Sequence, residues 1–144
     1  SAFSAEALMY DFYRENILDH GQHMRHKGLL DPASVDVEAD NPLCGDHLRL
    51  TLRVSDDGRV TDVGWDGDGC AISQASASML GEELIGKTLD EVKAITKDDV
   101  FEMIGIPLSM NRVKCGLLSL KVLTIGLYKL GVIEHPDVAE EDDE

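Results

Sequence analysis

Basic residues are scarce in this chain, and the imbalance excludes several kinds of partner. Against 28 Asp and Glu there are 13 Lys and Arg, so the formal net charge is −15. A field of that sign repels phosphate backbones and anionic lipid surfaces, so neither nucleic acid nor a membrane is expected as a partner. Residues 134–144 hold seven of the acids and no Lys or Arg. We expect them to form a disordered acidic tail after a single domain over residues 1–133.

Long apolar segments are also lacking. The most apolar stretch, residues 122–133, is interrupted by Lys129 and is too short to span a bilayer. The first twenty residues carry several charges and show no apolar core of the kind found in signal peptides. We therefore expect a soluble protein of the cytoplasm.

The chain has three cysteines, an odd number, and no Cys-x-x-Cys pair among them. A secreted disulfide framework would carry an even set, so that class is not expected. Separated cysteines in an intracellular chain serve as small buried side chains, as metal ligands or as nucleophiles. The count alone leaves these three uses open.

The hydrophobic pattern predicts an α+β fold, a small antiparallel sheet of about three strands covered on one face by helices. Apolar residues alternate over 47–55, Asp57-Gly58 marks a tight turn, and a returning strand follows. Apolar residues recur at helical spacing near both ends of the chain. The expected strands are 35–38, 47–55 and 60–65, and the expected helices are 6–19, 70–84, a short one opened by a capping box at 88–91, 98–104 and 111–130.

Four residues are candidates for one metal-binding site. Cys44 and Asp46 lie in a loop before the first long strand, Cys70 lies where a strand gives way to a helix, and Cys115 lies near the start of the last helix. Loops and a helix start can meet at one end of such a fold. A helix N-terminus favours the thiolate of Cys70. Three thiolates and one carboxylate suit tetrahedral zinc or the terminal positions of a [2Fe–2S] cluster.

The carboxylate of Asp46 is the mechanistically informative member of this set. A hard oxygen in place of a fourth soft thiolate should bind iron weakly and leave one corner exchangeable. The cations Arg112 and Lys114 lie next to Cys115 in sequence and favour its anion. Lys114 is either a solvated lysine or a group that could approach a metal or orient a sulfur. Arg112 is expected to form a salt bridge or to support the ligands rather than to act on the cargo.

Three blocks around these residues resemble the signature blocks of the IscU/SufU-type iron–sulfur cluster assembly scaffolds, the family that includes the NifU N-terminal domain. The resemblance covers roughly residues 8–131, and its middle block is long enough to be specific. The blocks are Asn41-Pro42-x-Cys44-Gly45-Asp46, Gly67-x-Gly69-Cys70-x-Ile72-Ser73-x-Ala75-Ser76-x-Ser78 and Arg112-x-Lys114-Cys115.

The resemblance implies a scaffold that receives sulfur from a cysteine desulfurase, builds a labile [2Fe–2S] cluster and passes it to apo-proteins. It implies Cys44, Asp46, Cys70 and Cys115 as ligands, Cys70 and Cys115 as persulfide acceptors, and Asp46 as the group that favours release. Lys114 stands where IscU-type members carry His, and the Arg-x-Lys-Cys block resembles the SufU branch. The SufU branch implies zinc at the same residues and a sulfurtransferase role, so cluster and zinc remain alternatives, and enzymatic activity remains open.

Several other polar residues are interpreted as structural. His20, His23 and His26 are spaced by three but lie in a stretch predicted to be a polar connection, so they are expected to be solvated rather than metal ligands. His47 is expected to be exposed on its strand. The serines at 73, 76 and 78 are expected to act as small packing residues, with Ser73 able to donate to a site sulfur. A purely structural zinc module and a cysteine hydrolase are weaker alternatives, the latter because only His47 lies near a cysteine in sequence.

Overall fold

The computed structural model describes residues 5–42 and 45–135, with side chains from residue 11 onward. It confirms the predicted α+β class: one three-stranded antiparallel sheet and five helices. The strands are β1 (Val35–Asn41), β2 (Asp46–Val54) and β3 (Val60–Asp68), in that order across the sheet. The helices are α1 (Ala5–Gln22), α2 (Ala71–Leu84), α3 (Leu89–Lys93), α4 (Lys97–Ile104) and α5 (Met110–Lys129).

The alternating pattern of β2 determines which face of the sheet is buried. Leu48, Leu50 and Leu52 are fully buried, and the antiparallel register places Leu50 between Val37 of β1 and Trp65 of β3. Successive strand residues point to opposite faces, so this row turns toward the helices while the residues between turn away. The buried face of the sheet is thus fixed by the sequence of its central strand.

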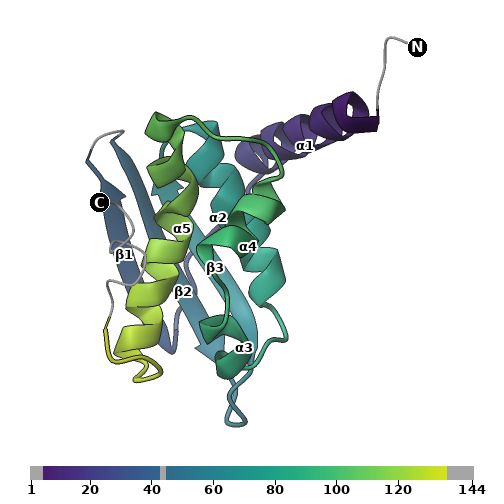
Figure 1. Ribbon diagram of the computed structural model, residues 1–144. Coiled ribbons are helices and arrows are strands. Elements are labelled where there is room, and N and C mark those ends of the chain that lie inside the picture. Colours follow the sequence, from purple (N-terminus) through teal and green to yellow (C-terminus); the bar gives the residue numbers. More distant parts are fainter. Residues whose placement is uncertain (1–4, 43–44, 136–144) are drawn as a thin grey trace.

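Helices α2 and α5 form the second layer of the molecule (Figure 1). Helix α5 packs on β1 and β2, helix α2 packs on β3, and the two helices also pack on each other. A hydrogen-bonded pair of serines joins them: Ser76 Oγ lies 2.8 Å from Ser119 Oγ and donates to the carbonyl of Gly116 at 2.7 Å. The sequence suggested only a packing role for Ser76. In the structure it also ties α2 to the turn of α5 that follows Cys115.

Helix α1 crosses α2 and is longer than predicted. It continues through His20 and ends at Gln22 rather than near Asp19. The prediction of a solvated His20 is wrong: the side chain is 7% exposed, and its Nδ1 lies 2.6 Å from Ser78 Oγ. Ser78 Oγ also accepts the backbone N–H of Arg25 at 2.8 Å. These bonds satisfy the polar groups where α1 ends against α2, which makes the longer helix stable there.

The short helices are positioned by their N-terminal caps. The capping box predicted at Thr88 and Glu91 is confirmed, and Thr96 with Asp99 forms a second one at the start of α4. In each, the threonine hydroxyl accepts from the third helical residue and the acid accepts from the cap residue. These caps fix where α3 and α4 begin.

The face of the sheet turned away from the helices is charged. Arg49 makes a two-pronged ion pair with Asp36 (2.8 and 2.6 Å), and its neighbours on this face are mostly acids. The segment after α1 returns along the edge of β3, where the N–H of Gly28 donates to the carbonyl of Trp65 at 2.7 Å. No helix among the described residues is long and apolar enough to cross a membrane.

Candidate metal centre

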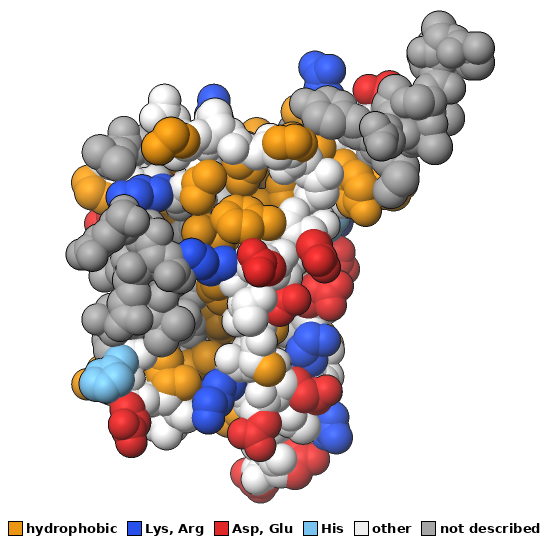
Figure 2. Space-filling model, viewed as in Figure 1, with side chains coloured by type: hydrophobic (Ala, Val, Ile, Leu, Met, Phe, Trp, Pro, Cys, Tyr) orange, Lys and Arg blue, Asp and Glu red, His pale blue; other side chains and the backbone are white. Residues whose placement is uncertain are grey.

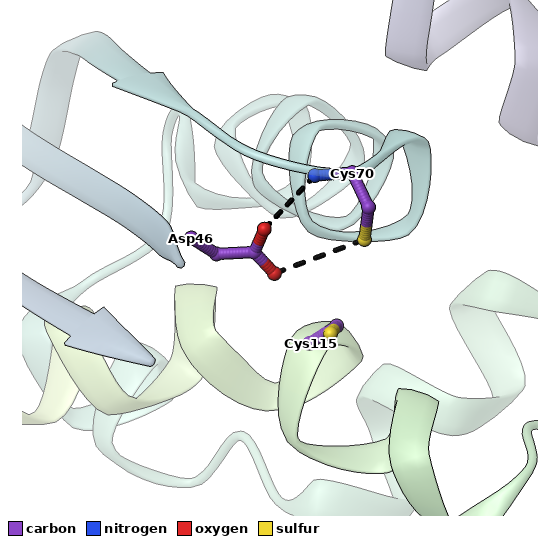
Figure 3. Close-up of side chains that lie close together, drawn as sticks. All are labelled: Asp46, Cys70 and Cys115. Atoms are coloured by element: carbon purple, nitrogen blue, oxygen red, sulfur yellow. Dashed lines mark hydrogen bonds between the residues drawn. The ribbon is translucent and has the colours of Figure 1, made fainter. Parts of the chain in front are cut away.

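Asp46, Cys70 and Cys115 lie close together at one end of the molecule (Figure 3). Asp46 is the first residue of β2, Cys70 is the residue that caps the N-terminus of α2, and Cys115 lies in the second turn of α5. One carboxylate oxygen and the two sulfurs all lie within 4.8 Å of one another. These three residues therefore lie together as predicted, although Asp46 begins the strand rather than lying in the loop before it.

The carboxylate of Asp46 is buried and holds Cys70 in place. The residue is 1% exposed. Its Oδ1 accepts the backbone N–H of Cys70 at 2.9 Å, and its Oδ2 accepts the thiol of Cys70 at 3.7 Å. A buried carboxylate requires such partners, and an acid at the start of a helix is further stabilised by the helix dipole. Asp46 thus fixes the junction between β3 and α2 while leaving Oδ2 directed at the sulfur.

Glycine is required at position 69 for this approach. Its φ is +155°, a region that side chains disfavour. A Cβ atom there would lie 2.4 Å from Asp46 Oδ1 and 2.6 Å from Ser73 Oγ. The Gly-x-Gly-Cys sequence is therefore what lets the carboxylate reach the amide of Cys70.

Cys115 faces the interior. It is fully buried, its thiol donates to the carbonyl of Asn111 at 3.7 Å, and Asn41 Nδ2 donates to its sulfur at 3.8 Å. Asn41 ends β1 and is 5% exposed. The contact of Asn41 with this sulfur was not predicted. The one sequence feature that could have indicated it is the position of Asn41 at the start of the block that contains Cys44.

The remaining candidates fall outside this group or outside the described residues. Cys44 is not among the described residues, so its predicted part in the site stays a prediction. Arg112 and Lys114 are exposed residues of α5. His47 bonds to Asp40 rather than joining the group, and Ser73 Oγ donates to the carbonyl of Cys70 at 3.0 Å rather than to a sulfur.

The donor set fits a thiophilic metal. Thiolates with a carboxylate bind zinc and iron, whereas magnesium and calcium prefer oxygen alone. Asp46, Cys70 and Cys115 form the single group of three His, Cys, Asp or Glu donors within metal-binding distance among the described side chains, those of residues 11–42 and 45–135. His20, His23 and His26 do not form another.

Comparison with known proteins agrees with the fold and identifies the family. The model of the family described as "NifU-like N terminal domain" matches residues 12–135. The chain is 34% identical over 143 residues to the zinc-dependent sulfurtransferase SufU of Bacillus subtilis, covering 88% of this chain and 96% of that protein. It is 36% identical over 134 residues to the iron–sulfur cluster assembly scaffold protein IscU of Thermotoga maritima, covering 82% and 94%.

Solved structures agree as well. A putative iron–sulfur cluster assembly scaffold for the SUF system from Fervidobacterium islandicum superposes with a TM-score of 0.68 at 31% identity, over 78% of this chain and 94% of that one. The N-terminal part of a NifU-like protein from Brucella abortus gives 0.69 at 25% identity, over 85% and 97%. The chain belongs to the NifU-like N-terminal domain family. The resemblance seen in the sequence blocks is confirmed.

Proposed function

We propose that this chain is a scaffold for iron–sulfur cluster assembly. It accepts sulfur from a cysteine desulfurase, holds a labile [2Fe–2S] cluster on Cys44, Asp46, Cys70 and Cys115, and passes the cluster to apo-proteins. The observation that carries the proposal is the convergence of Asp46, Cys70 and Cys115 within 4.8 Å. Membership of the family and the IscU relatives support it.

The contacts of Asp46 suggest how the cluster is kept exchangeable. Oδ1 is engaged by the amide of Cys70 at 2.9 Å, so Oδ2 remains as the ligand atom. A single carboxylate oxygen binds iron less firmly than a thiolate. Asp46 therefore acts as the weak ligand, while its other oxygen keeps Cys70 in position.

Sulfur delivery requires no added oxidant, but converting the delivered persulfide sulfur into cluster sulfide takes two electrons per sulfur from an external reductant. A thiolate of the scaffold attacks the outer sulfur of the persulfide on the desulfurase, a new S–S bond forms on the scaffold, and the desulfurase cysteine leaves as its thiolate. Cys70 and Cys115 are the candidate acceptors among the described cysteines. Cys70 is partly exposed and Cys115 is buried, so Cys70 is the more accessible of the two.

Anaerobic reconstitution with iron, cysteine, a dithiol reductant and a cysteine desulfurase tests the proposal. We expect a brown protein with thiolate-to-iron absorption, and loss of that absorption in Cys44→Ser, Cys70→Ser and Cys115→Ser. Asp46→Asn keeps an oxygen that can accept from the Cys70 amide but removes the charged ligand. Asp46→Cys supplies a fourth thiolate in place of the weak ligand, so we expect it to slow cluster transfer to an apo-ferredoxin by about tenfold, which equals ~1.4 kcal/mol in the barrier.

The Asp46 variants separate the two roles of this residue. Asp46→Ala removes both the ligand and the acceptor for the Cys70 amide, so we expect less cluster per chain than in Asp46→Asn. Unchanged transfer from Asp46→Cys would contradict the role given to the carboxylate. Failure of the wild-type chain to bind any cluster would contradict the scaffold proposal itself.

A zinc-bound sulfurtransferase is the second candidate. The Arg112-x-Lys114-Cys115 block and the SufU relative at 34% identity favour it. The same four residues would hold the metal, which would keep their thiols deprotonated. Metal analysis of protein purified without added iron, paired with a desulfurase turnover assay, distinguishes the candidates. One tightly held zinc per chain, strong stimulation of turnover and no transferable cluster would favour the sulfurtransferase.

A further inference from the structure

A groove separate from the metal centre lies among α1, α2 and α4. Its volume is about 590 Å³, within the range of pockets that hold ligands in proteins. Its apolar lining includes the part-exposed side chains of Tyr13, Ile95 and Met103 and the buried side chains of Leu80 and Val100. Asp46, Cys70 and Cys115 do not line it. The groove therefore offers apolar surface that the proposed cluster chemistry does not use.

Acidic side chains surround this apolar surface. Glu82 and Glu83 of α2 and Asp99 and Glu102 of α4 line the groove and are exposed. Figure 2 shows acids gathered over this part of the molecule, beside α4 and below α1. Lys87 is the single Lys or Arg among the lining residues, all of which are described. The groove thus presents an apolar surface with a negative rim.

Two of these four carboxylates already have partners within the protein. Glu83 pairs with Lys87 at 3.7 Å, and Asp99 accepts the N–H of Thr96 in the cap of α4. Glu82 and Glu102 form neither a hydrogen bond nor an ion pair with any described residue. They lie on different helices, so a ligand in the groove could meet a carboxylate from each.

His20 does not neutralise this rim. It lines the groove with its Nδ1 engaged by Ser78. Burial, aided by the nearby charge of Arg25, lowers the pKa of His20, although Glu82 and Asp19 act in the opposite direction. The ring is therefore neutral near pH 7, and the negative charge of Glu82 and Glu102 is left for a partner.

We propose that this groove binds an amphipathic segment of a partner protein, in which apolar side chains are flanked by Lys or Arg. The apolar lining matches the apolar side chains, and the carboxylates of Glu82 and Glu102 match the flanking cations. Helix-in-groove recognition uses this combination. A phosphate-bearing or lipid partner would be repelled by the same charges. Because the metal-site residues lie outside the groove, a partner can occupy it while the site is loaded.

The test uses a synthetic peptide and isotope-labelled full-length protein. The peptide has about 15 residues, the length at which isolated helices become marginally stable, with Leu at helical spacing and Lys beside each Leu. Titration at physiological salt, followed by NMR, should shift the signals of the residues that line the groove. We expect Glu82→Gln/Glu102→Gln to weaken binding by at least about tenfold, as two lost charge contacts predict.

A matched control separates the groove from the overall charge. Glu38→Gln/Asp66→Asn removes the same number of charges from the exposed face of the sheet and should leave the affinity within about twofold. Equal weakening by both double variants would overturn the proposal, because it would show attraction to the whole acidic chain. A peptide with Ser in place of Leu should bind at least tenfold more weakly, by loss of apolar burial. Equal binding of that peptide, or a dimer of this chain closing the groove, would also overturn the proposal.

Discussion

Exposure distinguishes the two described cysteines of the metal centre. Cys70 lies at the junction before α2 and is partly exposed, whereas Cys115 is covered on all sides. A thiol reacts with a dissolved reagent only when it is accessible, and a buried thiol must wait for local opening. The difference concerns single side chains and can be measured without any metal.

We expect iodoacetamide to modify Cys70 at least about tenfold faster than Cys115 in metal-free protein, because Cys115 reacts only through opening of the structure. Mass spectrometry of the two proteolytic peptides over time gives each rate separately. The same ratio should disappear in urea, where both thiols are exposed. Equal rates under native conditions would show that Cys115 is not buried in solution.

For single residues, the sequence predicted which side chains form the candidate metal centre, but it did not predict the hydrogen bonds that those side chains make. Asp46, Cys70 and Cys115 could be grouped because their blocks carry glycines and ligand-type side chains. The bond from the Cys70 amide to Asp46 Oδ1 could not be predicted, since it depends on the path of the chain through Gly69. The same holds for Asn41, whose amide reaches Cys115 only once β1 and α5 have packed together.

Among the elements, the pairing of α2 with α5 has the clearest energetic consequence. Ser76 and Ser119 are fully buried, and Ser119 Oγ bonds to Ser76 Oγ, which also donates to the carbonyl of Gly116. A buried hydroxyl that loses its partner costs more than a pair removed together, because the remaining group stays desolvated. The two residues are therefore energetically coupled.

Ser76→Ala should lower the free energy of unfolding by about 1–3 kcal/mol, since it leaves Ser119 Oγ and the Gly116 carbonyl without this partner. The double variant Ser76→Ala/Ser119→Ala should cost less than the sum of the two single changes. Urea unfolding of the four proteins completes the double-mutant cycle. Strict additivity would contradict the coupling.

The helices and strands also show where the spacing of residue types in the sequence predicts secondary structure reliably. The strands followed from the alternation of residues 47–55, and both capping boxes have a recognisable spacing, although only the first was predicted. Helix α1 was predicted too short because His20, Gly21 and Gln22 are polar or small. The structure stabilises that last turn through Ser78, which is distant in sequence, so local preference could not reveal it.

For the whole molecule, the metal centre connects parts of the chain that are far apart in sequence. Its described donors come from the start of β2, the start of α2 and the second turn of α5. The hydrophobic core, which includes Leu50, Trp65 and Leu123, lies outside this group and is fully buried. A bound metal should therefore add stability to a domain that already folds.

Removal of zinc with a chelator should leave the helical circular dichroism intact and lower the free energy of unfolding. At a free zinc concentration a hundredfold above Kd, linkage gives a difference of ~2.7 kcal/mol. Thermal or urea unfolding with and without zinc measures it, and Cys115→Ser serves as the control with a smaller difference. Complete loss of structure on chelation would instead indicate a structural zinc module.

The backbone where β3 ends and the chain enters α2 has a practical consequence. Gly67 and Gly69 both have φ of +155°, and a Cβ on either would collide with β2 or its side chains. Asp68 stands between them, is exposed, and carries no such restriction. A fluorescent amino acid introduced there would stand two residues from Cys70, where its emission could report the arrival and departure of cargo in real time.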